Sequence, residues 1–178
     1  MKNVLVISSS LRKNSNSYSL AKEFARGAEE SGNNVEFISL MGKRIEFCKG
    51  CLACQKTQRC VINDNADEIR EKMLNADTVV FATPIYYYEM SGQLKTLLDR
   101  MNPLYSSDYA FRNIYVLTTA AEDEAHVPER AISGVQGWID CFKKAQLAGT
   151  LFCGGVNDPG DITDNAALHK AYEMGKHI

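Results

Sequence analysis

The sequence predicts an α/β fold built on a parallel sheet, because short apolar runs of strand length alternate along the chain with segments of helical periodicity. Five such alternations fit into 178 residues, and no repeat or linker interrupts them, so we expect one domain over residues 1–178. Hydrophobic residues make up 45% and charged residues 24% of the chain, which is typical of a folded globular protein.

The first half of the chain shows two strands and one helix. Val4–Ile7 is a continuous apolar run, as expected for a strand that is covered on both faces. Apolar residues then recur at helical spacing over residues 20–28, and Gly32 ends that helix. Val35–Leu40 is the second predicted strand.

The middle of the chain adds two helices around a third strand. Asn65 with Glu68 three residues later resembles a capping box and predicts a helix start. Thr78–Ala82 is the third strand, and Ser91 can cap the next helix, whose apolar face ends at Met101.

The last third repeats the alternation twice. Asn113–Leu117 is the fourth strand, and Pro128 suits the first turn of the helix that follows. Leu147–Cys153 is the fifth strand, and Asn165–Lys176 is a final helix.

Strands separated by helices pair in parallel through right-handed crossovers. Five units of this length favour a flavodoxin-like, doubly wound, five-stranded parallel sheet of order 2-1-3-4-5 with helices on both faces. Such sheets bind ligands where loops leave the carboxyl ends of the strands. The important loops therefore begin at Ser8, Thr83 and Thr118.

Charge and hydropathy exclude several classes of partner. The net charge is −2, so nothing favours binding to nucleic acid or to an anionic membrane surface. No apolar run is long enough to span a membrane, and the run after Met1 is too short for a signal peptide. We therefore expect a cytoplasmic protein whose six cysteines do not form a disulfide framework.

The loop after the first strand predicts an anion site. Residues 8–17 contain five serines, two asparagines and two cations directly before a helix. Free backbone N–H groups and the helix dipole favour an anion there, and Arg12 can fork onto phosphate oxygens. The P-loop and Rossmann glycine motifs are both absent, which argues against nucleotide hydrolysis and dinucleotide binding.

The loop after the third strand carries three consecutive tyrosines, Tyr86–Tyr88, between Pro84 and Gly92. Tyrosines at the carboxyl edge of a sheet form a flat, amphipathic wall. Ordinary packing or a subunit interface is the alternative interpretation of these tyrosines, strongest for Tyr88.

Together the two loops resemble motifs of the NAD(P)H-dependent FMN reductases. Ser9–Ser17 is similar to the phosphate loop G-S-x-R-x-x-S-N-[ST] of that family, with Ser9 in place of glycine. Thr83–Arg100 is similar to its ring-binding segment T-P-[IE]-Y…S-[GA]-x-[LM]-K…D-R. The resemblance covers nearly the whole chain in matching order.

The resemblance implies FMN as cofactor and NAD(P)H as electron donor. The residues implied to hold the FMN phosphate are Ser10, Arg12, Ser15, Asn16 and Ser17. Those implied to contact the isoalloxazine ring are Pro84, Ile85, Tyr86, Tyr87, Thr118 and Thr119. Redox chemistry belongs to the cofactor, so the motifs identify no particular acid–base residue.

Four of the cysteines, Cys48, Cys51, Cys54 and Cys60, lie within thirteen residues. Steps of three resemble the start of a cubane-cluster motif more than a zinc site with paired knuckles. The spacing resembles that of the iron–sulfur flavoproteins, where these positions carry a [4Fe–4S] cluster. Free thiols and zinc remain alternatives, and we expect the loop to lie on the carboxyl edge of the sheet.

Two functions are compatible with these features. One is an enzyme that takes hydride from NAD(P)H and passes electrons to a flavin, a quinone or another small acceptor. The other is an electron carrier with FMN and a [4Fe–4S] cluster that exchanges electrons with a ferredoxin-like protein. The resemblance implies a homodimer or homotetramer. The isolated Cys141 and Cys153 are expected to be small buried apolar residues.

Overall fold

A parallel sheet forms the centre of the computed structural model, which describes residues 1–178. Its five main strands follow the order β2-β1-β3-β5-β6. They are β1 (Asn3–Ser8), β2 (Asn34–Ser39), β3 (Thr78–Tyr86), β5 (Asn113–Thr119) and β6 (Gln146–Cys153). Counted along the chain without the short β4, this is the predicted order 2-1-3-4-5, and every neighbouring pair is parallel. The predicted flavodoxin-like topology is therefore confirmed.

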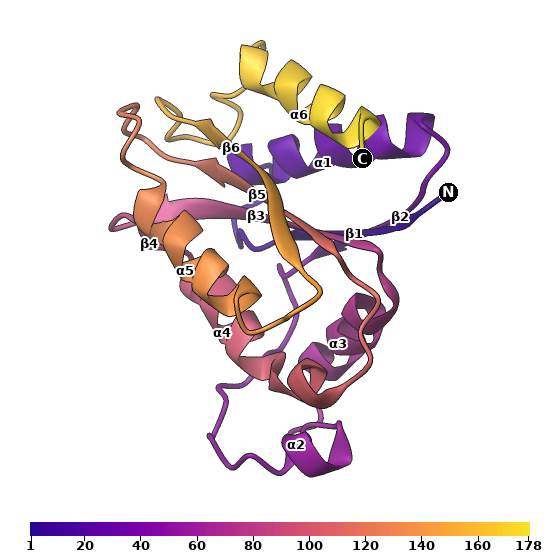
Figure 1. The fold of residues 1–178 in the computed structure, drawn as a ribbon. Coiled ribbons are helices and arrows are strands. Elements are labelled where there is room, and N and C mark those ends of the chain that lie inside the picture. Colours follow the sequence, from indigo (N-terminus) through magenta and orange to yellow (C-terminus); the bar gives the residue numbers. More distant parts are fainter.

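Helices cover both faces of the sheet (Figure 1). One face carries α1 (Asn16–Glu30) and α6 (Ala166–Lys176). The other carries α3 (Asn65–Asn75), α4 (Gly92–Arg100) and α5 (Glu129–Ile139). Two short elements, α2 (Cys54–Thr57) and the 3-10 helix η1 (Asn102–Ser106), lie beyond the end of α4. None of the helices combines the length and the apolar composition that crossing a bilayer requires.

The alternation of side chains along each strand divides the core into two layers. Val4 and Val6 of β1 pack with the apolar residues of α1 and α6. Leu5 and Ile7 point the other way and pack with those of α3, α4 and α5. Both faces are therefore buried, which explains why the strands appear in the sequence as unbroken apolar runs.

The helix layer formed by α1 and α6 depends on a close approach of the two helices. A Cβ added at Gly27 would lie 2.0 Å from the carbonyl oxygen of Tyr172, and one at Gly175 would lie 2.0 Å from that of Phe24. Two helix backbones in such contact leave no space for a side chain. These glycines therefore explain how α6 closes over α1.

Several element boundaries differ from the prediction. Strand β3 continues to Tyr86 rather than ending at Ala82, because Ile85 and Tyr86 pair antiparallel with β4 (Glu89–Met90). Asp64, rather than Asn65, caps α3 by accepting the N–H of Ala66 at 3.0 Å.

The starts of the other helices agree more closely with the prediction. Pro128 immediately precedes the first residue of α5 instead of lying in its first turn. Ser91 caps α4 as predicted, because its Oγ accepts the N–H of Leu94. Asn165 is the N-cap of α6.

Candidate functional site

A polar cradle forms where β1 turns into α1. Ser15 is the N-cap of α1 and its Oγ accepts the N–H of Tyr18 at 3.2 Å. Ser10, Ser15 and Ser17 are all buried, and the hydroxyls of Ser15 and Ser17 lie 3.5 Å apart. The first turn of α1 contains no acidic residue. The helix dipole and these hydroxyls therefore favour an anion at this helix start.

The loop after β6 forms the other side of the cradle. The Nη1 of Arg12 donates to the carbonyl of Asn157 at 2.8 Å, and its Nη2 lies 3.6 Å from the carboxylate of Asp158. The Nδ2 of Asn16 donates to the carbonyl of Asp158, and its Oδ1 accepts the N–H groups of Gly160 and Ile162. The amide of Asn16 therefore positions this loop, while Arg12 remains half-exposed beside the cradle.

The tyrosine loop forms a wall next to the cradle. Pro84, Ile85 and Tyr86 lie at the end of β3 and face the same cavity. Tyr87 is 98% exposed and does not line it. Tyr87 and Tyr88 have φ angles of 51° and 66°, so the turn into β4 uses the left-handed region twice.

Nine of the eleven residues that the resemblance implies as FMN contacts line one cavity of about 130 Å³. They are Ser10, Arg12, Ser15, Asn16, Ser17, Pro84, Ile85, Tyr86 and Thr119. The exceptions are Tyr87, which points to solvent, and Thr118, which is fully buried and donates to the carbonyl of Leu151. This cavity is small, so a ligand larger than a phosphate ion must extend out of it along the wall formed by Pro84, Ile85 and Tyr86.

Sequence reasoning missed the contribution of the loop after β6. Val156, Asn157 and Pro159 line the cavity, together with Ala121 from the loop after β5. The signal was present, because this loop also leaves the carboxyl end of a parallel strand. The backbone joins the two loops, with the N–H of Val156 donating to the carbonyl of Ala120 at 2.9 Å.

Tyr88 connects the tyrosine loop to the loop after β5. Its ring stacks on His126 with centroids 6.1 Å apart and lies beneath the guanidinium of Arg130. A hydrogen bond to Glu122 and the negative charge of that carboxylate raise the pKa of the Tyr88 hydroxyl. His126 itself is exposed and packs on Tyr88.

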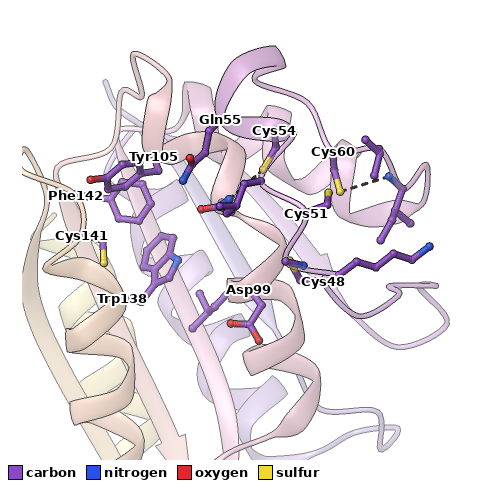
Figure 2. A pocket seen from close by; sticks show the side chains of 17 residues that line it. Cys48, Cys51, Cys54, Gln55, Cys60, Asp99, Tyr105, Trp138, Cys141 and Phe142 are labelled. Atoms are coloured by element: carbon purple, nitrogen blue, oxygen red, sulfur yellow. Dashed lines mark hydrogen bonds between the residues drawn. The ribbon is translucent and has the colours of Figure 1, made fainter.

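The cysteine motif lines a second, larger cavity of about 560 Å³. Cys48, Cys51, Cys54 and Cys60 lie on one side of it, and Figure 2 shows Tyr105, Trp138, Phe142 and Cys141 on the other. Cys153 is buried as expected, whereas Cys141 is exposed at the end of α5, so its predicted burial is wrong.

The donor chemistry of this cavity fits a group held by thiolates. Cys54 accepts the Nδ2–H of Asn102 at 3.0 Å, and backbone N–H groups point to Cys48 and Cys60 at 3.4 Å and 3.5 Å. Such N–H donors commonly support sulfur ligands. No three metal-binding side chains are gathered closely enough to hold an ion. The four thiols therefore share one wall without forming a closed site.

The expected position of the cysteine loop is wrong. It was expected on the carboxyl edge of the sheet, but Cys54 contacts Asn102, which comes two residues after the end of α4. Helix α4 starts beside β4 at the carboxyl edge and runs away from it for about 13 Å. The cysteine loop thus lies beyond the far end of α4, and the two cavities share no lining residue.

Comparisons with known proteins agree with this architecture. A family model described as NADPH-dependent FMN reductase matches residues 2–131. The chain is 30% identical to an iron–sulfur flavoprotein of Methanosarcina thermophila over 173 residues, 97% of this chain and 91% of that one. It is 41% identical to an iron–sulfur flavoprotein of Methanocaldococcus jannaschii over 101 residues, 57% of this chain and about half, 52%, of that one. An NAD(P)H:quinone oxidoreductase from Methanothermobacter marburgensis has a similar fold, with a TM-score of 0.72, 19% identity and 98% of each chain covered.

Proposed function

Because the chain belongs to the NADPH-dependent FMN reductase family, and is thus an oxidoreductase, we propose that it binds FMN at the carboxyl edge of its sheet, accepts hydride from NAD(P)H and passes electrons to a small acceptor such as a flavin or a quinone. One observation carries this proposal. A buried, hydroxyl-rich helix start without acidic residues faces the wall of Pro84, Ile85 and Tyr86 across a single cavity.

The cradle is suited to the phosphate of FMN. The backbone N–H groups at the start of α1 and the hydroxyls of Ser10, Ser15 and Ser17 would donate to the phosphate oxygens. Arg12 would add a charge-assisted bond from the half-exposed rim. Asn16 would act by holding the loop after β6 in place rather than by touching the phosphate.

The wall is suited to a planar ring. Bound FMN would accept the hydride from NAD(P)H and pass on its electrons, and the chain would orient the ring and shield one side of it from water. Pro84, Ile85 and Tyr86 would contact one side of the ring, and Thr119 and Ala120 would meet its edge. Tyr87 is exposed at the turn, where it is free to pack over the ring or against a second subunit.

Reduction of FMN-loaded protein by NADH and NADPH under anaerobic stopped-flow conditions tests the enzyme proposal. Loss of the flavin absorbance with either nucleotide, followed by its return when a quinone is added, supports it. A flavin that neither nucleotide bleaches, in a protein that binds FMN stoichiometrically, contradicts the hydride step.

A second candidate is an electron carrier with FMN and a [4Fe–4S] cluster on Cys48, Cys51, Cys54 and Cys60. The observation that favours it is that all four thiols line one cavity, in a chain related over most of its length to a protein named an iron–sulfur flavoprotein. A ferredoxin-like protein is the partner that such a carrier would need.

Iron analysis of anaerobically purified protein distinguishes the two candidates, since a cubane cluster predicts about four irons per chain. Cys51→Ser should remove most of the iron. Cys141→Ser is the matched control, because Cys141 lines the same cavity but lies outside the motif. Protein without iron, or equal iron in both variants, contradicts the second candidate and leaves the FMN reductase.

The proposed assembly is a homodimer or homotetramer. The exposed Tyr87 and Tyr105 support it, since large aromatic side chains on a surface commonly mark contacts between subunits. Light scattering after size exclusion measures the mass, and a monomer would contradict this part of the proposal.

A further inference from the structure

The side chain of Arg100 is completely buried at the end of α4. Its Nη1 donates to the carboxylate of Asp64 at 2.7 Å and to the carbonyl of Glu46 at 2.8 Å. Its Nη2 donates to the other oxygen of Asp64 at 3.0 Å and to the carbonyl of Ile62 at 3.1 Å. One guanidinium therefore makes four hydrogen bonds to a segment that is distant in sequence.

Those acceptors lie at both ends of the cysteine loop. Glu46 comes two residues before Cys48, and Ile62 comes two residues after Cys60. Asp64 strengthens the closure, because its Oδ2 also accepts the N–H of Glu46 at 2.8 Å. The two ends of the segment of residues 47–61 are thus held by the same pair of charged side chains, Arg100 and Asp64.

The remaining donor of Arg100, its Nε–H, is buried and has no partner. A buried donor without a partner is costly, typically by about 1–3 kcal/mol. Cys60 lies in the same part of the loop, because its sulfur accepts the N–H of Ile62 at 3.5 Å and the carbonyl of Ile62 accepts a bond from Arg100. Burial lowers the pKa of Arg100, but its bond to Asp64 and its interaction with Cys60 raise it more, so the net shift is upward.

We propose that Arg100 is the positioning residue of the cysteine cavity: it closes the loop of residues 47–61 at both ends, and its unpaired Nε–H becomes a donor to the sulfur of Cys60 when the thiolates hold a cluster. The loop-closing part stands on the geometry alone. The part concerning Cys60 rests on the iron–sulfur candidate, because hydrogen bonds and positive charge near a ligand sulfur raise the reduction potential of a cluster.

Arg70 provides a matched comparison within the same chain. It is also buried, with 4% of its side chain exposed, and it pairs with Asp67 and Glu71 of its own helix. Its contacts stay within α3 and reach no residue between Glu46 and Ile62. Replacing Arg70 by Lys therefore perturbs a buried ion pair without releasing the cysteine loop.

The experiment compares Arg100→Lys with Arg70→Lys in FMN-loaded protein, using FMN content as the measure of folding. In iron-free samples, hydrogen exchange and limited proteolysis of residues 47–61 report loop closure. We expect both rates to rise about tenfold in Arg100→Lys and to stay at the wild-type level in Arg70→Lys. Equal protection of the loop in the two variants overturns the loop-closing role.

The midpoint potential of the iron-loaded protein, taken from a redox titration followed by absorbance, tests the bond to Cys60. Arg100→Lys should shift it to a more negative value, whereas Arg70→Lys should not. An unchanged potential with the cluster retained overturns the Nε–H bond to sulfur. If the wild-type protein contains no iron, both the bond from Arg100 to a cluster-bound Cys60 and the carrier function are overturned. The exchange measurement then still decides whether Arg100 closes the loop.

If Arg100→Lys does not retain FMN, Asp64→Asn replaces it in the hydrogen-exchange measurement. It leaves the carbonyls of Glu46 and Ile62 available to Arg100 but loosens the guanidinium. Faster exchange of residues 47–61 than in Arg70→Lys supports the proposal, and equal exchange contradicts it.

Discussion

The hydroxyl oxygens of Ser9 and Ser91 lie 2.8 Å apart, although the two residues are 82 positions apart in the chain. Both side chains are fully buried. Ser9 opens the loop that forms the polar cradle, and Ser91 caps α4 directly after the tyrosine loop. This hydrogen bond therefore joins two of the loops that line the proposed FMN site, the polar cradle and the tyrosine loop.

Ser91→Ala should lower the free energy of unfolding by about 2 kcal/mol, because it removes both the cap of α4 and the bond to Ser9. Ser9→Ala keeps the bond between Ser91 and Leu94 and should cost about 1 kcal/mol. Urea unfolding of both variants measures the difference. An equal loss in the two variants would show that the cap contributes nothing.

Arg12→Ala should weaken FMN binding by about 10-fold to 100-fold, the effect of losing one charged hydrogen bond to phosphate. Lys13→Ala is the control, since Lys13 is exposed and does not line the cavity, and it should change affinity by about threefold at most. Quenching of flavin fluorescence during titration of the apoprotein gives both dissociation constants. Indistinguishable values would remove Arg12 from the phosphate site.

Gly154→Ala should reduce FMN occupancy and destabilise the fold by about 1–3 kcal/mol. An added Cβ would lie 2.5 Å from the Cα of Asp123 and from the carbonyl oxygen of Glu122, so the loops after β5 and β6 would have to separate. Gly137→Ala in α5 meets nothing within 4 Å and should stabilise by about 0.5–1 kcal/mol. Thermal unfolding and flavin content measure the contrast. Full occupancy in Gly154→Ala would show that these loops do not shape the site.

Asp64 should make stability depend on acidic pH. Burial alone would raise the pKa of Asp64, but bonds from Arg100 and from the backbone N–H groups of Glu46 and Ala66 outweigh it and lower the pKa. A lowered pKa means that the stabilisation is present above the ordinary carboxyl value of about 3.9 and is lost as the pH falls through the folded-state value.

The change that tests this dependence is Asp64→Asn. It should cost about 3 kcal/mol at neutral pH, and the cost should shrink below about pH 4, because Asp64 of the unfolded chain is protonated first and folded Asp64 only at still lower pH. Urea unfolding across this range measures it. A constant difference at every pH would assign the effect to packing instead of charge.

Much of the fold could be predicted because both faces of the sheet are buried, which leaves unbroken apolar strands such as Val4–Ile7 between clear helices. Strand β4 was missed because two residues carry no periodicity. Asp64 was missed as a cap because the adjacent Asn65, with Glu68, fits the capping-box pattern equally well.

The candidate site was predictable where motif and strand direction agreed, as for Ser10 and Pro84. It was not predictable where local geometry decides. Thr118 and Thr119 are neighbours on a strand, so their side chains point to opposite faces and only Thr119 reaches the cavity. The path of the cysteine loop depends on long-range bonds to Arg100, which no local pattern reveals.

The closure of residues 47–61 on Arg100 also bears on how this scaffold can evolve. None of the sheet strands passes through that segment, and its two ends are held whatever lies between them. Its length and composition can therefore change without disturbing the polar cradle at the other end of α4. We therefore expect insertions, deletions or substitutions within this segment to leave its two ends, and the fold beyond them, in place.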